Sequence, residues 1–136
     1  ANLVLASLIE TEVPDYEDQR IVAGLLKKRL ASGMRLQVDS TICYIKESLR
    51  QGAKNGRNCY PLIPLDFTVD SPYNTYRYKG LPPGPIANPG VSALRSALAP
   101  KNSDFWFYLS DPKTKKTIFS KTFEEHKLKR IKYLGK

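Results

Sequence analysis

Histidine and cysteine, the residues that most often hold transition metals, are scarce in this sequence. His126 is the one histidine among 136 residues, and Cys43 and Cys59 are the two cysteines. The cysteines form no C-x-x-C motif and the histidine is distant from both along the chain, so the pattern predicts neither a metal site nor a cofactor. A disulfide in an oxidising compartment and two buried, reduced thiols are both compatible with the sequence.

The sequence also lacks long apolar runs and the common catalytic motifs. No window approaches the 18 consecutive apolar residues typical of a membrane-spanning helix. There is no H-E-x-x-H, no G-x-S-x-G, no glycine-rich phosphate-binding loop and no Cys/His nucleophile pair. The sequence therefore does not predict a zinc protease, a serine or cysteine hydrolase or a phosphate-binding enzyme. Carboxylates remain as the candidate catalytic groups.

Acidic residues become rare toward the C-terminus. The net charge is +9, and residues 113–136 contain nine lysines and arginines against Glu124 and Glu125. This excess favours a polyanionic partner, such as nucleic acid, anionic lipid or an anionic cell wall, unless it is only a solvated helix face. Because the basic residues lie apart from the aromatic segment "YNTY" (73–76), we do not predict nucleic acid as the partner.

Apolar spacing and capping residues predict one α+β domain over residues 1–136, with helices packed around a small antiparallel sheet. Asp15 and Thr122 are predicted N-caps, and Gly33 is a predicted C-terminal stop. "FWFYLS" (105–110) and "KTIFS" (116–120) predict a β-hairpin, and "MRLQVD" (34–39) alternates like a short strand. The predicted helices cover residues 2–12, 16–32, 40–51, 91–99 and 123–134.

The first predicted helix carries the most informative carboxylates. At about 100° per residue, Glu12 falls on the same side as Leu8 and Ile9, whereas Glu10 projects to the more polar side. Partial burial would raise the pKa of Glu12, as a general acid requires near neutral pH. The alternative is that the helix frays before Pro14 and leaves Glu12 in water.

The segment "GLPPGPIANPG" (80–90) contains four prolines and three glycines. Proline fixes φ and glycine permits unusual φ, so the segment predicts a stiff loop of defined shape. With "YNTY" just before it and Ile86 and Asn88 within it, we expect the loop to form one wall of a sugar-binding groove. Glu12 is expected to point into that groove from the opposite side.

Five blocks of the sequence occur in a characteristic order: "LASLIETE" (5–12), "IVAGLLKKRLASGMRLQVDST" (21–41), "YNTYRYKGLPPGPIANPGVSALRSALAP" (73–100), "FWFYLSD" (105–111) and "TIFSKTFEEHK" (117–127). In this order they resemble the catalytic domain of the YceG-like endolytic murein transglycosylases, and the resemblance covers nearly the whole chain. It implies that the α+β domain is a two-layer sandwich. The sequence departs from the family at Ser40, where proline is usual, and over residues 43–61, which replace the family's usual segment.

The resemblance implies a lytic transglycosylase that cleaves the β-1,4 bond between MurNAc and GlcNAc within peptidoglycan strands. Its product would carry a 1,6-anhydro-MurNAc end, and its essential acid would be a glutamate of the E-x-E pair, which we assign to Glu12 with Glu10 as the alternative. A non-catalytic peptidoglycan-binding domain remains a rival interpretation, as does a muramidase that uses water with Asp39 as its base. The predicted substrate-binding residues are Ser7, Gln37, Asp39, Tyr73, Asn74, Tyr76, Pro83, Ile86 and Asn88.

The resemblance also implies a cellular setting. Peptidoglycan strands would be the substrate, and peptidoglycan synthases would be partners of the full-length protein. The N-terminal membrane helix and LysM-like subdomain of the family are absent from these 136 residues. We therefore expect this to be the catalytic part of a longer, membrane-anchored protein on the extracytoplasmic face of the bacterial cell membrane.

Overall fold

The computed structural model describes residues 1–49, 59 and 61–136. In this part of the chain the helices and the antiparallel strand pair confirm the predicted α+β class. The predicted end of the third helix at residue 51 and the loop that follows it lie outside the described residues. The elements are α1 (Asn2–Glu12), α2 (Tyr16–Ser32), α3 (Asp39–Leu49), the 3-10 helix η1 (Pro64–Thr68), α4 (Val91–Leu98), β1 (Phe107–Ser110), β2 (Thr117–Ser120) and α5 (Phe123–Leu134).

Helix ends follow the capping residues that the sequence supplies. The Asp15 side chain accepts a hydrogen bond from the Asp18 amide at the start of α2, and Gly33 ends that helix with a left-handed φ of 76°. Glycine suits this position because a left-handed backbone is costly for residues with a Cβ. Thr122 and Glu125 form a reciprocal capping box at the start of α5. The predicted caps are therefore confirmed.

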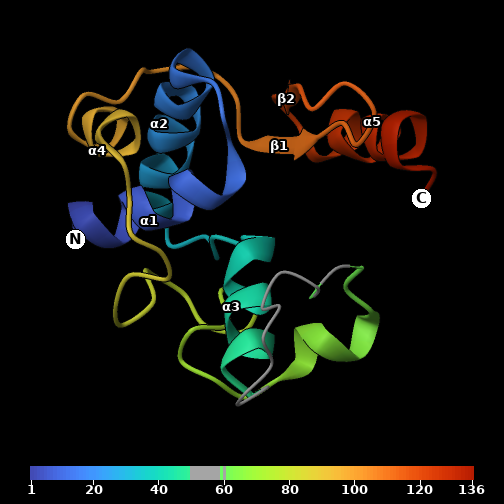
Figure 1. Cartoon of the computed structure of the whole chain (residues 1–136). Helices are drawn as coiled ribbons and strands as arrows, with labels where there is room; N and C mark the ends of the chain where they lie inside the picture. The colour runs from blue at the N-terminus through green and yellow to red at the C-terminus, as the bar shows by residue number, and fades with distance from the viewer. Residues whose placement is uncertain (50–58, 60) are drawn as a thin grey trace.

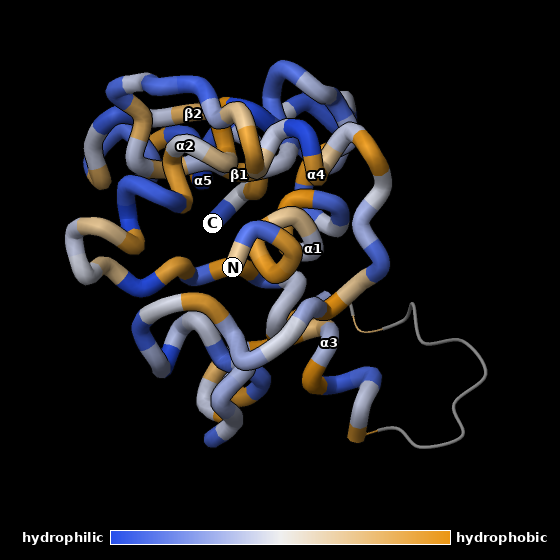
Figure 2. Tube along the Cα trace, turned by 90° about the vertical axis from the view of Figure 1, so that its left-hand side faces the viewer, coloured by the Kyte–Doolittle hydropathy of each residue, from blue (hydrophilic) through white to orange (hydrophobic). Residues whose placement is uncertain are grey.

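The hydrophobic core lies between α1, α2 and α4. It includes residues of α1 and α2 that are completely buried, among them Leu8, Ile9, Val22 and Leu25. Figure 2 shows α1 at the centre of the molecule, with α2 and α4 above it and α3 below it. Helix α1 therefore lies between α3 on one side and α2 and α4 on the other. No helix among the described residues is long and apolar enough to cross a membrane.

The hairpin and α5 lie together at one edge of the molecule (Figure 1). The strands pair antiparallel, with Phe107 opposite Ser120 and Tyr108 opposite Phe119. Phe119 also stacks on Phe105 at 5.2 Å between ring centroids. Tyr108 of β1 lies beside the end of α1, because its hydroxyl donates a hydrogen bond to Glu12, the last residue of that helix.

The predicted strand over residues 34–39 is wrong. Gln37 adopts a left-handed φ of 54°, which interrupts an extended backbone. Its amide donates to the carbonyl of Thr75, but the next amide, of Val38, donates to the Thr75 hydroxyl, and the Leu36 carbonyl accepts from Arg29. Two of these three groups are thus satisfied by side chains and not by a neighbouring strand, and Asp39 begins α3 instead of ending a strand.

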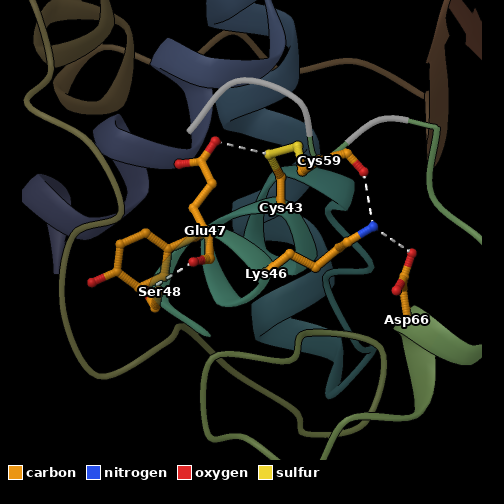
Figure 3. Close-up of a disulfide and its surroundings, with 7 residues drawn as sticks. Cys43, Lys46, Glu47, Ser48, Cys59 and Asp66 are labelled. Atoms are coloured by element: carbon orange, nitrogen blue, oxygen red, sulfur yellow. Dashed lines mark hydrogen bonds and ion pairs between the residues drawn. A yellow bond between two sulfur atoms is a disulfide. The ribbon is translucent and has the colours of Figure 1, made fainter. Parts of the chain in front are cut away.

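Cys43 and Cys59 form a disulfide, with 5.3 Å between their Cα atoms. The bond ties α3 to the segment that precedes η1 (Figure 3). Lys46 reinforces the same connection, because its ammonium lies 3.0 Å from both the Cys59 carbonyl and an Asp66 carboxylate oxygen. Of the two states that the sequence left open, the structure contains the disulfide.

Candidate active site

The C-terminal end of α1 is held in place and does not fray. Val13 leaves the helix with an extended backbone and is buried in the core. The Gln19 side chain donates to the Val13 carbonyl at 2.9 Å, which satisfies a backbone acceptor just past the helix end. Glu12, the last residue of α1, is consequently half-buried. The alternative in which Glu12 is fully in water is therefore wrong.

The carboxyl group of Glu12 has an environment suited to holding a proton near neutral pH. Its Oε1 atom accepts a hydrogen bond of 2.8 Å from the Tyr108 hydroxyl. Burial, and to a smaller extent the negative charge of Asp39, raise the pKa of Glu12 from 4.5 to about 7, against the opposing effect of the Tyr108 hydrogen bond. Both protonation states are thus accessible near pH 7, which is what a group that gives and then takes a proton needs.

Asp39 and Tyr76 form the second part of the site. Asp39 begins α3, and one of its carboxylate oxygens accepts a short hydrogen bond from the Tyr76 hydroxyl. The Tyr76 ring packs edge-on against Phe67 at 4.8 Å, which fixes its orientation. Burial and Asp39 raise the pKa of Tyr76, and Glu12 contributes to the same shift. The structure therefore brings together Glu12, Asp39 and Tyr76, three of the residues predicted from the sequence.

A buried arginine holds the backbone around this cluster. Arg29 is 3% exposed, and its Nε and Nη2 atoms donate to the Trp106 carbonyl at 3.0 and 2.6 Å. Its Nη1 atom donates to the Leu36 carbonyl. Its positive charge acts on Tyr76 and Tyr108, where it opposes the upward pKa shifts. One guanidinium thus fixes the segment that leads to Asp39 and the segment that leads to Tyr108.

Sequence reasoning missed both Arg29 and Tyr108. Arg29 follows two lysines on a helix, where it looks like a solvated charge, and Tyr108 lies 96 residues from Glu12. No local spacing links these positions, so only the folded chain shows their connection to Glu12.

An open hollow of about 440 Å³ borders the end of α1. Its lining is mostly polar and includes both glutamates of the E-x-E pair. A sugar could approach Glu12 from this hollow, since hydroxyl and amide groups of a glycan need polar partners. The lining residues are Glu10, Thr11, Glu12, Val13, Pro14, Gln19 and Ser92.

The two glutamates of the pair have different environments. Glu10 is exposed, and its Oε1 atom accepts a hydrogen bond of 2.8 Å from the amide of Gly90, the N-cap residue of α4. A carboxylate at a helix N-terminus satisfies an unpaired amide and complements the helix dipole. Glu10 therefore has a structural contact that accounts for it, whereas Glu12 lies in the half-buried cluster with Asp39 and Tyr76.

The proline-glycine loop lies against α1 instead of facing it across a groove. The Ile86 amide donates to the Ser7 hydroxyl at 3.1 Å, and the Gly90 amide donates to Glu10. These two contacts fasten the loop to the helix that carries Glu12. The prediction that Glu12 points in from the side opposite the loop is therefore wrong. The loop is anchored on α1 by these two hydrogen bonds.

Several predicted substrate-binding residues have structural positions. Ser7 and Asn74 are fully buried. The Asn74 amide donates to the carbonyls of Phe67 and Val69 at 3.0 and 2.8 Å and accepts from the Tyr76 amide at 2.9 Å, so it holds a turn together. For Ser7 and Asn74 the predicted sugar contact is corrected, because neither side chain reaches the surface.

The remaining predicted residues are accessible to different extents. Gln37, Pro83 and Asn88 are exposed, and Ile86 is half-buried against the core. Tyr73 is half-buried, and its ring lies 5.0 Å from that of Tyr44. For these five residues a contact with a glycan stays a prediction.

The chain matches the profile of the YceG-like family over residues 1–132. The chain belongs to the YceG-like family. Two relatives agree with this assignment, and both carry the name endolytic murein transglycosylase. The YceG-like chain is 38% identical to the relative from Bacillus subtilis over 133 residues, which are 98% of this chain and 34% of that protein. It is 32% identical to the relative from Streptococcus pneumoniae strain D39 over 124 residues, which are 91% of this chain and 22% of that protein.

A solved structure supports the fold of the YceG-like chain. The crystal structure of a yceG-like protein from Listeria monocytogenes matches it with a TM-score of 0.79 and 42% sequence identity. The match covers 93% of this chain and 38% of the Listeria protein. The YceG-like chain thus spans about a third of the Bacillus relative and less than half of the Listeria protein.

Proposed function

We propose that this YceG-like chain is the catalytic part of a lytic transglycosylase that acts on peptidoglycan. The observation that carries the proposal is the state of Glu12, a half-buried residue that borders an open polar hollow and whose carboxyl group has a pKa of about 7. The names of the Bacillus and Streptococcus relatives support peptidoglycan strands as the substrate. Cleavage falls at the MurNAc–GlcNAc β-1,4 bond, within strands.

In this proposal Glu12 acts first as an acid and then as a base. Its proton passes to the glycosidic oxygen as the bond from that oxygen to C1 of MurNAc breaks. The resulting carboxylate then takes the proton of the C6 hydroxyl of the same MurNAc, and O6 bonds to C1 to close the 1,6-anhydro ring. No water is consumed, and Glu12 returns to its protonated form. Tyr108 occupies Oε1, which leaves Oε2 as the oxygen that transfers the proton.

Asp39 has a positioning role in this scheme. Ordinary glycoside hydrolases use two carboxylates, one as acid and one as nucleophile or base. Here the Asp39 carboxylate is engaged by the Tyr76 hydroxyl, and its charge helps to keep Glu12 protonated. The proximity of Asp39 is also what favours the second candidate function, a muramidase in which Asp39 activates water. The two candidates differ in their product.

We place the protein on the extracytoplasmic side of the bacterial membrane, where its substrate lies. The Cys43–Cys59 disulfide supports this location, because such bonds persist in oxidising compartments. Peptidoglycan synthases would be its partners in the cell, since they produce the strands that it cuts.

Mass spectrometry of glycan ends distinguishes the candidates. Purified peptidoglycan is digested by the protein in water labelled with heavy oxygen. We expect muramic acid ends that are lighter by one water than those from a hydrolase, without heavy oxygen, and released from the interior of strands. Reducing ends that carry heavy oxygen would make the protein a muramidase. Retained binding to the wall without any new ends would make it a non-catalytic binding domain.

A further inference from the structure

The outer side of α5 has no role in the fold of the described residues. The helix lies at the edge of the molecule, against the hairpin (Figure 1). Its inner side is half-buried through His126, Lys129 and Tyr133. His126 stacks on Phe107 at 5.1 Å, and the Lys129 ammonium donates to the Phe119 carbonyl at 2.6 Å. The inner side alone therefore accounts for how α5 is held.

Three apolar side chains form a stripe on the outer side. Leu128 is 68% exposed, Ile131 is 62% exposed and Leu134 is 38% exposed. Their spacing of three residues puts them next to one another on a helix. An exposed apolar stripe of this kind on a soluble surface marks an interaction site more often than isolated apolar residues do.

Basic residues border this stripe. Residues 126–136 contain five lysines and arginines and no acidic residue. Glu124, one turn earlier, is paired with Lys127 at 3.9 Å. We define the outer face of α5 by its exposed residues Lys127, Leu128, Arg130, Ile131, Lys132 and Leu134. This face combines an apolar centre with positive flanks.

We propose that the outer face of α5 binds the surface of an anionic phospholipid membrane. The leucines and isoleucine would enter the interfacial layer, and the flanking lysines and arginine would contact lipid phosphates. A nucleic acid or an anionic glycan would satisfy the positive charges but leave the apolar stripe in water. A second copy of the chain would cover the stripe but bring like charges together. The lipid surface is the partner that satisfies both features.

Vesicle flotation tests the proposal with the unmodified protein as reference. We expect binding to vesicles that contain phosphatidylglycerol and phosphatidylcholine, and little binding to vesicles of phosphatidylcholine alone. The double variant Leu128→Ser/Ile131→Ser should weaken the binding about tenfold, because two apolar side chains no longer enter the interface. The matched control is Leu65→Ser/Leu98→Ser, which alters two side chains that are similarly exposed, at 72% and 68%, and lie on other elements.

A charge variant gives an independent test. The triple variant Lys127→Gln/Arg130→Gln/Lys132→Gln should weaken binding on the order of a hundredfold, since each basic residue near an anionic surface contributes separately. Its control removes three exposed charges elsewhere, through Lys79→Gln, Arg95→Gln and Lys101→Gln. Equal losses in variant and control would mean that only net charge matters, and the proposal would be overturned.

Two further outcomes would overturn the proposal in favour of another partner. In the first, an oligonucleotide or an anionic polysaccharide competes fully with vesicles, and the serine variant binds vesicles and the competitor as well as wild type does. The face would then bind polyanions in general. If sedimentation shows a dimer that the serine variant dissociates, the face is an interface between copies. Membrane binding by the outer face of α5 does not depend on glycan cleavage. Glu12→Gln should therefore bind vesicles as wild type does, even if it has lost glycan cleavage.

Discussion

Replacing Glu12 by glutamine is expected to raise the free energy of unfolding above neutral pH while it removes catalysis. The folded pKa of Glu12, about 7, lies above its unfolded value of 4.5. Between these values the folded protein binds more protons than the unfolded chain, so stability falls as pH rises. The contribution is complete below pH 4.5 and is lost as pH passes through about 7. Glutamine does not titrate, and its amide oxygen can still accept the hydrogen bond from Tyr108.

The size of the effect follows from the same pKa values. The difference between the folded and unfolded values corresponds to roughly 3 kcal/mol when Glu12 is fully ionised. Glu12 keeps some contact with solvent at the hollow, and this reduces the cost of ionising it. We therefore expect the stability advantage of the glutamine variant over wild type to be about 1–3 kcal/mol larger at pH 8 than at pH 5.

Urea unfolding of both proteins at pH 5 and pH 8 measures this difference. Other groups with shifted pKa values, such as Asp111 and His126, titrate in both proteins and cancel in the comparison. Glu10→Gln is the matched control, and its stability should follow wild type at both pH values. If Glu12→Gln and wild type respond to pH in parallel, the carboxyl group of Glu12 does not have the environment described here, and the reasoning fails.

Three other substitutions test separate parts of the site and its support. Tyr108→Phe removes a hydrogen bond that lowers the pKa of Glu12, so the alkaline limb of the pH profile of kcat/KM should move up by about one unit, and an unmoved limb would contradict the contact. Glu10→Ala should lower the free energy of unfolding by about 1 kcal/mol through the lost contact with Gly90, with turnover per folded molecule unchanged; a large loss of turnover would give Glu10 a catalytic role. Asn74→Ala should cost at least about 2 kcal/mol in urea unfolding because three backbone groups lose their partner, and a neutral result would return Asn74 to the list of ligand contacts.

Local features of the sequence predicted most of the secondary structure. The helices over α1, α2, α4 and α5 and the hairpin depend on periodicity, caps and a turn, all of which act within a few residues. The predicted strand at residues 34–39 is wrong because the Leu36 carbonyl and the Val38 amide pair with the side chains of Arg29 and Thr75 and not with a neighbouring strand. Alternation of apolar and polar residues reports burial of one face, but it does not report whether a neighbouring strand exists.

Only part of the candidate site was predicted, because local sequence patterns do not report contacts between distant segments. The helical wheel placed Glu12 on the buried side of α1, and the structure agrees. Ser7 and Asn74 were predicted to bind sugar because polar side chains near a predicted groove look alike in sequence, whether they face solvent or hold the backbone. Tyr108 reaches Glu12 across 96 residues of chain, a contact that depends on the packing of the hairpin against the core. The local sequence pattern does not predict that packing.

Turnover of purified peptidoglycan by the matched variants Glu12→Gln and Glu10→Gln tests the central claim most directly. Both changes remove one carboxylate and keep the size and an acceptor oxygen, and they lie two residues apart on the same helix. Loss of the acid should lower the rate of glycan cleavage on the order of a hundredfold or more for Glu12→Gln. Glu10→Gln should cleave at a rate near wild type. An active Glu12→Gln together with an inactive Glu10→Gln would contradict the assignment of Glu12 as the proton donor.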